Sequence, residues 1–84
     1  MLGYVFSYFN GVAGDAEFFT DKKMAVKEAK EYWEHLTDKE KEKMEYCHVV
    51  EFECSEEEFE EMQENGYNEE YWVSDVWNMD ENDN

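Results

Sequence analysis

The chain begins with a segment dense in aromatic and β-branched residues, from Leu2 to Phe9. Residues of these types favour strands, and Asn10-Gly11 directly after the segment is a strong turn signal. We therefore predict a first strand over residues 2–9. Residues 16–19 are predicted to form a short return strand, because the intervening residues would allow a loose hairpin loop.

The segment from Asp21 to His35 has the pattern of an amphipathic helix, which either Thr20 or Asp21 could cap. Its apolar residues recur at intervals of three and four, at Ala25, Ala29, Tyr32 and Leu36. Thr37 and Glu40 then form a capping-box pattern, in which the hydroxyl and the carboxylate bind free amides at a new helical start. We expect the chain to bend near Thr37 and to continue as a helix to about Glu45.

Residues 46–54 alternate between two faces, which is typical of a half-buried strand. Cys47 and Cys54 should lie on opposite faces of this strand and roughly 23 Å apart, at about 3.3 Å per residue. A disulfide requires Cα atoms within about 7 Å of each other. Two reduced thiols are therefore expected.

A second capping box, at Ser55 and Glu58, predicts a helix that ends at Asn65-Gly66, since glycine accepts the left-handed conformation after a helix. Residues 71–77 are predicted to form the last strand. This order of elements indicates the α+β class, with helices packed on one face of a small, mostly antiparallel sheet. The sheet has three strands, or four if the short return strand forms. We expect a single domain over residues 1–78 and a disordered acidic tail over residues 79–84.

Composition places the chain among folded rather than disordered proteins, since 18% of its residues are aromatic and 42% are hydrophobic. No apolar run approaches the ~20 residues that a membrane span needs. The first residues lack the basic region and cleavage pattern of a signal peptide. We therefore expect a cytoplasmic protein.

Charge is distributed very unevenly along the chain. Residues 1–43 carry nine acids and seven lysines, so their net charge is −2. Residues 44–84 carry fifteen acids and no lysine or arginine, so their net charge is −15. A large field of one sign destabilises a compact state by self-repulsion and mainly steers association with an oppositely charged partner. The second half of the chain is therefore predicted to bind a basic partner.

The helix predicted after Ser55 concentrates this charge on its outward side. A rotation of about 100° per residue places Phe59 and Met62 on one side. Five glutamates cluster opposite them, at Glu56, Glu57, Glu60, Glu61 and Glu64. Two interpretations remain: a charged face that is merely solvated, or an interaction surface. The missing lysines favour the second, because solvated helix faces usually carry both signs. Glu69, Glu70 and Asp75 are predicted to support this surface.

Other chemistry has weak support in the sequence. His35, His48 and the two cysteines lack the paired spacing of a zinc site, and the acidic residues 80–84 lack the glycine and the terminal glutamate of a calcium loop. There is no phosphate-binding glycine-rich loop and no catalytic triad pattern. We expect no enzyme activity, no cofactor and no metal site.

The aromatic residues near the C-terminus leave two roles open. Tyr71, Trp72 and Trp77 could belong to the core of the last strand or could form part of an exposed patch for a partner. Direct binding of nucleic acid by these rings is disfavoured, because the surrounding acids would repel phosphates.

In size, charge and the acidic face over residues 56–64, the chain resembles the small acidic inhibitors encoded by phages and mobile elements, among them anti-CRISPR and DNA-mimicking anti-restriction proteins. The resemblance is one of class and implies a non-enzymatic protein in the cytoplasm of a bacterial host. Such a protein would occupy the nucleic-acid-binding groove of a CRISPR effector or a restriction enzyme, and anti-CRISPR is the first expectation. The alternative is a generic acidic interaction module that neutralises a basic partner without mimicking nucleic acid. The sequence leaves the target, the inhibited step and the oligomeric state open.

Overall fold

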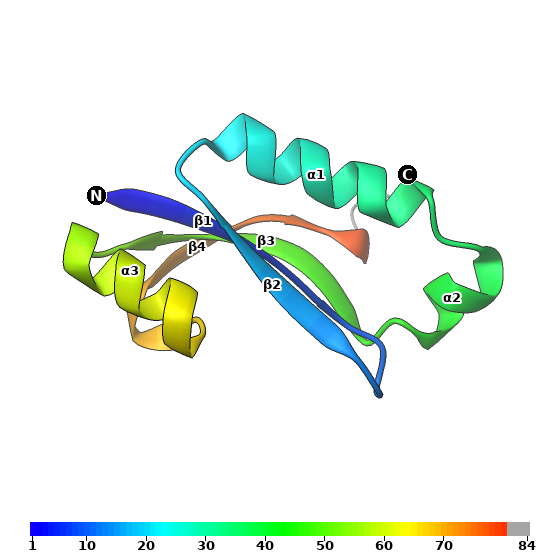
Figure 1. Cartoon of the computed structure of the whole chain (residues 1–84). Coiled ribbons are helices and arrows are strands. Elements are labelled where there is room, and N and C mark those ends of the chain that lie inside the picture. The colour runs from blue at the N-terminus through cyan, green and yellow to red at the C-terminus, as the bar shows by residue number, and fades with distance from the viewer. Residues whose placement is uncertain (81–84) are drawn as a thin grey trace.

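The computed structural model describes residues 1–80, which form a four-stranded antiparallel sheet with helices on both faces (Figure 1). The strands, which lie in the order β2-β1-β3-β4, are β1 (Leu2–Phe9), β2 (Gly14–Phe19), β3 (Tyr46–Glu53) and β4 (Trp72–Asn78). The helical elements are α1 (Lys22–Glu34), α2 (Asp38–Lys43), α3 (Glu56–Asn65) and the 3-10 turn η1 (Glu69–Tyr71). The predicted α+β class is confirmed, and the return strand makes the sheet four-stranded.

The two faces of the sheet carry separate hydrophobic clusters. Side chains alternate along β1, and this places Tyr4 and Phe6 on the face that α1 covers. Ala25, Ala29 and Trp33 of α1 pack against them. Val5 points to the other face, where Phe52 packs with Met62 and Phe59 of α3. The expectation that all helices pack on one face is therefore corrected, because α3 covers the face opposite α1. The physical reason is that the central strands β1 and β3 carry apolar side chains on both faces, so a helix must shield each face from water.

Local sequence signals set the helix boundaries. The Asp21 carboxylate accepts a hydrogen bond from Lys23 N at 2.8 Å and caps α1, and Thr37 with Glu40 forms the expected capping box. The second helix ends at Lys43, two residues earlier than expected. The box at Ser55 and the predicted end of α3 are also present. Gly66 has a φ of 102°, and its N–H donates a hydrogen bond to Met62 O, with N and O 2.8 Å apart.

The C-terminal segment differs from the sequence prediction in detail. Residues 69–71 form η1, so β4 begins at Trp72 rather than at residue 71. Two register shifts interrupt its pairing with β3. Met79 packs against the cluster under α1, one residue beyond the predicted domain boundary. The part of the expected tail over residues 81–84 lies outside the described residues.

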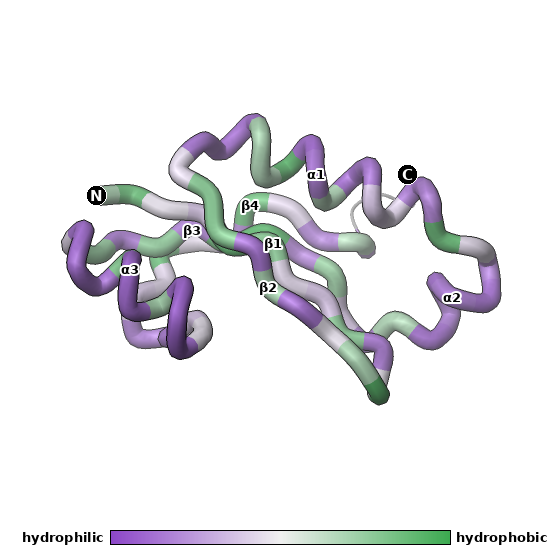
Figure 2. Tube along the Cα trace, viewed as in Figure 1, coloured by the Kyte–Doolittle hydropathy of each residue, from purple (hydrophilic) through white to green (hydrophobic). Residues whose placement is uncertain are grey.

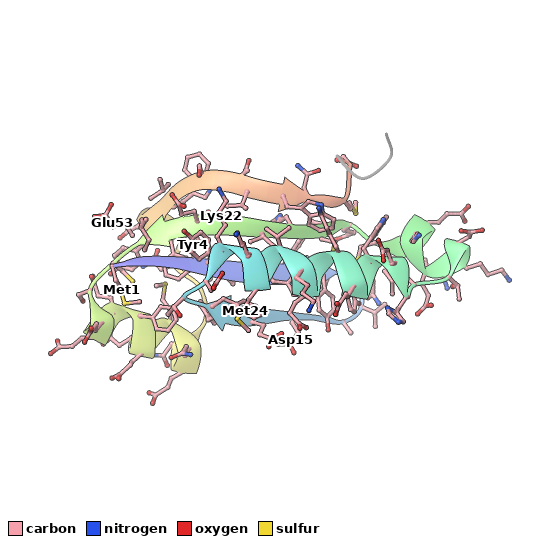
Figure 3. All side chains as sticks on the ribbon, turned by 90° about the horizontal axis from the view of Figure 1, so that it is seen from above. Met1, Tyr4, Asp15, Lys22, Met24 and Glu53 are labelled. Carbon is pink, nitrogen blue, oxygen red and sulfur yellow. The ribbon has the colours of Figure 1, made fainter. Side chains whose placement is uncertain are left out.

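Both cysteines are free, as expected, and they lie in different clusters. Cys47 is 1% exposed in the cluster under α1, and Cys54 is 7% exposed in the cluster under α3. Seen from above, α1 runs along the sheet, with the labelled Lys22 and Met24 in its first turn (Figure 3). α3 lies near one end of the sheet, and α2 lies beyond the other (Figure 1).

Candidate functional site

The outward side of α3 carries the five glutamates that the sequence predicts. Phe59 and Met62 pack against the sheet, and this fixes which side of the helix faces solvent. All five glutamates are exposed; we call this surface the α3 acidic face, consisting of Glu56, Glu57, Glu60, Glu61 and Glu64. Figure 2 shows α3 as almost continuously hydrophilic along its outer side. The predicted clustering of these side chains is thus present in the fold.

Glu58 lies on the same helix but has a structural role. Its Oε1 accepts a hydrogen bond from Ser55 N at 2.8 Å, and its Oε2 accepts one from the Tyr71 hydroxyl at 2.5 Å. These hydrogen bonds, with that from Tyr71 the largest cause, lower the pKa of the Glu58 carboxyl. The capping box is readable from sequence, whereas the contact with Tyr71 is not, because it joins residues thirteen positions apart.

Tyr71 brings η1 next to α3. Its pKa is raised to about 12, first by the hydrogen bond to Glu58 and by desolvation, and then by the negative charges of Glu58, Glu61 and Glu70. Of the residues predicted to support the acidic face, Glu70 is the one whose charge acts on the same phenol as Glu58 and Glu61 of α3.

Glu69 and Asp75 lie in a different setting, in the same groove lining as Tyr67. Burial is the main cause of the raised pKa of Tyr67, and the charges of Glu69 and Asp75 add to it. The Asp75 carboxylate also accepts a hydrogen bond from the Trp72 indole, with Nε1 3.2 Å from Oδ1. Both acids line a groove that no pattern in the sequence predicts.

The groove occupies the part of the sheet face that α3 leaves open. Its volume is about 1050 Å³. We call it the sheet-face groove. Its lining consists of Ser7, Tyr8, Phe9, Gly14, Asp15, Ala16, Tyr46, His48, Val50, Tyr67, Glu69, Trp72 and Asp75. Alternation along β3 already placed Tyr46 and His48 on one face, but only the short length and the position of α3 leave that face uncovered.

Two rings in the groove, those of Tyr46 and His48, are stacked, and the ring of Phe9 is tilted against Tyr46. The ring centroids of Tyr46 and His48 are 4.9 Å apart with an interplanar angle of 20°, and Phe9 lies 6.1 Å from Tyr46. Burial lowers the pKa of His48, and the nearby Asp75 opposes this shift. The Tyr67 hydroxyl is buried and has no hydrogen-bond partner within residues 1–80. A buried polar group without a partner costs about 1–3 kcal/mol, so this hydroxyl is a local cost to the fold.

The three C-terminal aromatic residues, whose role the sequence left open, divide between core and surface. Trp77 is 5% exposed and packs under α1, whereas Trp72 is 51% exposed. Tyr71, the last residue of η1, is half-buried and packs against the cluster under α3. The last strand therefore supplies one core residue and one surface ring in the groove.

The lysines lie away from the α3 acidic face, whereas the N-terminal ammonium group donates a hydrogen bond to Cys54 O, just before α3. Every lysine of the chain lies between Lys22 and Lys43, and these residues belong to α1 and α2. Helix α1 covers the opposite face of the sheet, and α2 lies near the opposite end (Figure 1). Lys41 contacts the ring of Trp33, with Nζ 5.4 Å from the centroid. The fold thus keeps the charge segregation of the sequence and converts it into a polarised surface.

Other chemistry finds little support in the described chain. Residues 1–80 hold no group of three or more His, Cys, Asp or Glu side chains arranged to bind a metal ion. His35 Nδ1 is 2.6 Å from Glu31 O, at the end of α1. In the same range, no helix is both long enough and apolar enough to cross a membrane.

Comparison with known proteins gives no relative from which a role could be transferred: no family model, curated protein or solved structure matches this chain.

Proposed function

We propose that the protein is a non-enzymatic inhibitor that inserts the α3 acidic face into the nucleic-acid-binding groove of an effector, with an anti-CRISPR role as the first candidate. Its site of action would be the cytoplasm of a bacterial host. The observation that carries the proposal is the row of five exposed carboxylates on α3, which the fold keeps apart from every lysine.

The charge density of this face supports mimicry of nucleic acid. From Glu56 to Glu64 the helix rises about 12 Å, at 1.5 Å per residue. Five carboxylates over this length give one negative charge per about 2.4 Å, against about 1.7 Å along a DNA duplex. The electrostatic field of the α3 acidic face is therefore similar to that of the DNA phosphates that such a groove binds.

Retaining this face has an energetic cost, which supports a role in binding. Three pairs of α3 glutamates lie four residues apart, namely Glu56/Glu60, Glu60/Glu64 and Glu57/Glu61. Each like-charge pair destabilises an isolated helix by about 0.2–0.5 kcal/mol. The helix dipole favours acids in the first turn only, so it does not offset the repulsion at Glu60, Glu61 and Glu64.

A displacement assay tests the proposal. Guide-loaded CRISPR effectors and restriction enzymes are bound to fluorescent duplex DNA, and the protein is titrated against each complex. We expect DNA release from at least one effector, with an inhibition constant that rises steeply with salt, since exposed charges are screened beyond about 10 Å at 0.1 M. The double variant Glu60→Lys, Glu61→Lys should abolish the release.

The matched control is the double variant Glu28→Lys, Glu34→Lys, which changes the net charge equally on α1, across the sheet from α3. It should displace DNA nearly as well as the unmodified protein. Equal loss in both double variants would contradict an α3 interface and would indicate a general charge effect. Binding to an effector that leaves its DNA in place would instead support the alternative, an acidic module that neutralises a basic partner without mimicry.

A further inference from the structure

We infer that the sheet-face groove is a second interaction site, which binds an extended cationic peptide segment of a partner protein through stacked aromatic rings and the carboxylates of Glu69 and Asp75. This inference goes beyond the proposed function, because it concerns a different surface and does not depend on the α3 acidic face.

The shape of the groove fits an extended chain. Along β3 it is lined by Tyr46, His48 and Val50, and at its far end by Trp72 of β4, which is paired with Phe52; it also extends over Ser7–Phe9 of β1 and Gly14–Ala16 of β2. The six steps of strand from residue 46 to residue 52 span about 20 Å, at about 3.3 Å per residue. A peptide of similar length could therefore contact both ends of the groove. In an extended peptide, alternate side chains would point to the floor of the groove.

The chemistry of the groove favours a cation. Tyr46 and Trp72 are 41% and 51% exposed, so both present ring surface to solvent. Exposed aromatic faces attract guanidinium and ammonium groups, and carboxylates bind them by charge-assisted hydrogen bonds. The groove lining contains no lysine. Burial lowers the pKa of His48, which keeps this ring neutral near pH 7 and removes a competing positive charge.

Charge also argues against a second copy of the chain as the occupant. Each copy carries a net charge of −17, and its lysines are confined to residues 22–43. Bringing two such chains together at a groove that contains Glu69 and Asp75 would be opposed by repulsion. A cationic segment is attracted by the same field, so the electrostatics favour it over self-association.

The test uses the capped peptide Ac-Gly-Arg-Gly-Arg-Gly-NH2, whose two arginines fall on one side of an extended chain. The control peptide replaces both arginines by citrulline, which keeps the shape and removes the charge. Trp72 is the exposed tryptophan, whereas Trp33 and Trp77 are buried, so tryptophan fluorescence reports on the groove. Amide and indole NMR shifts then locate the bound peptide.

We expect the arginine peptide to shift resonances of Tyr46, His48 and the Trp72 indole, and to bind roughly tenfold more tightly than the citrulline peptide. The double variant Glu69→Gln, Asp75→Asn should weaken binding by about tenfold. The amide oxygen that this variant carries at position 75 can still accept the Trp72 indole hydrogen bond, so the variant should stay folded, and an unchanged melting curve would verify that. The control variant Glu60→Gln, Glu64→Gln removes two charges from α3 and should weaken binding by less than about twofold.

Three results would overturn the inference: no preference for the arginine peptide over the citrulline peptide, peptide-induced shifts confined to α3, or equal losses in the groove and α3 variants. The DNA-displacement assay is independent of all three. Failure of the groove and failure of the α3 proposal are therefore distinguishable.

Discussion

The Tyr71 hydroxyl donates a hydrogen bond of 2.5 Å to Glu58 Oε2, and this contact joins η1 to the first turn of α3. The other oxygen of the same carboxylate completes the capping box with Ser55 N. One glutamate therefore both starts the helix and fixes the segment that leads into β4. The α3 acidic face and the sheet-face groove are positioned relative to each other through this residue.

Tyr71→Phe should lower the melting temperature near pH 7. This decrease should become smaller at strongly acid and at strongly alkaline pH. The pKa of Glu58 is lowered in the folded protein, so its stabilising contribution is present above the unfolded pKa and disappears as pH falls through the folded value. The pKa of Tyr71 is raised from 10.0 to about 12, so its contribution is present below 10 and is lost between about 10 and 12.

Melting temperatures of the variant and the unmodified protein should therefore converge below the Glu58 pKa and again above about pH 12. A constant difference from acid to alkaline pH would show that the hydroxyl contributes by packing rather than by this hydrogen bond.

Ser55→Ala should reduce the free energy of unfolding by about 0.5–2 kcal/mol, because it removes the side-chain oxygen that binds Glu58 N at 3.1 Å. Urea denaturation measures the change. Ser74→Ala, an exposed position on β4, is the control and should change stability by less than about 0.5 kcal/mol. Equal effects at the two serines would mean that the cap contributes nothing specific.

Glu60→Lys combined with Glu61→Lys should stabilise the domain by about 1 kcal/mol at low salt, because it turns all three like-charge pairs of α3 into opposite ones. Thermal melts at low and high salt measure the gain, which should shrink as salt screens the pairs. If this variant is more stable and still displaces DNA, the α3 acidic face is a solvated surface and not the interface.

Gly3→Ala should destabilise the fold by about 1–3 kcal/mol. A Cβ at this position would lie 2.5 Å from Cζ of Phe52, so this fully buried ring would have to shift within the core. Ser7→Ala, on the same face of β1, adds no atoms and should have a small effect. A variant with unchanged stability would show that the Phe52 ring has room to shift.

Both thiols should react slowly with Ellman's reagent at pH 8 in the native protein and rapidly in urea. Burial raises the pKa of Cys47 to about 11 and also raises that of Cys54, so little thiolate is present. The absorbance of the released dye gives both rates. Fast reaction of one thiol in the native state would place that residue in a region that opens locally.

The sequence determined those features that depend on neighbouring residues. The capping boxes at Thr37 and Ser55 need a hydroxyl and a carboxylate three positions apart, and that spacing is visible in the chain. The outward orientation of the α3 glutamates follows from helical periodicity once Phe59 and Met62 are taken as the buried side. The separation of Cys47 from Cys54 follows in the same way from alternation along one strand.

Only the tertiary structure decided how these elements meet. Helical periodicity shows that α1 and α3 each bury one side, but it carries no information on which face of the sheet each helix covers. That choice came from the central strands β1 and β3, which are apolar on both faces and need two covers. Because α3 is short, it leaves Tyr46 and His48 uncovered, and η1 places Glu69 in the lining of the same groove. The groove depends on contacts between residues far apart in the chain, and for that reason no local pattern could reveal it.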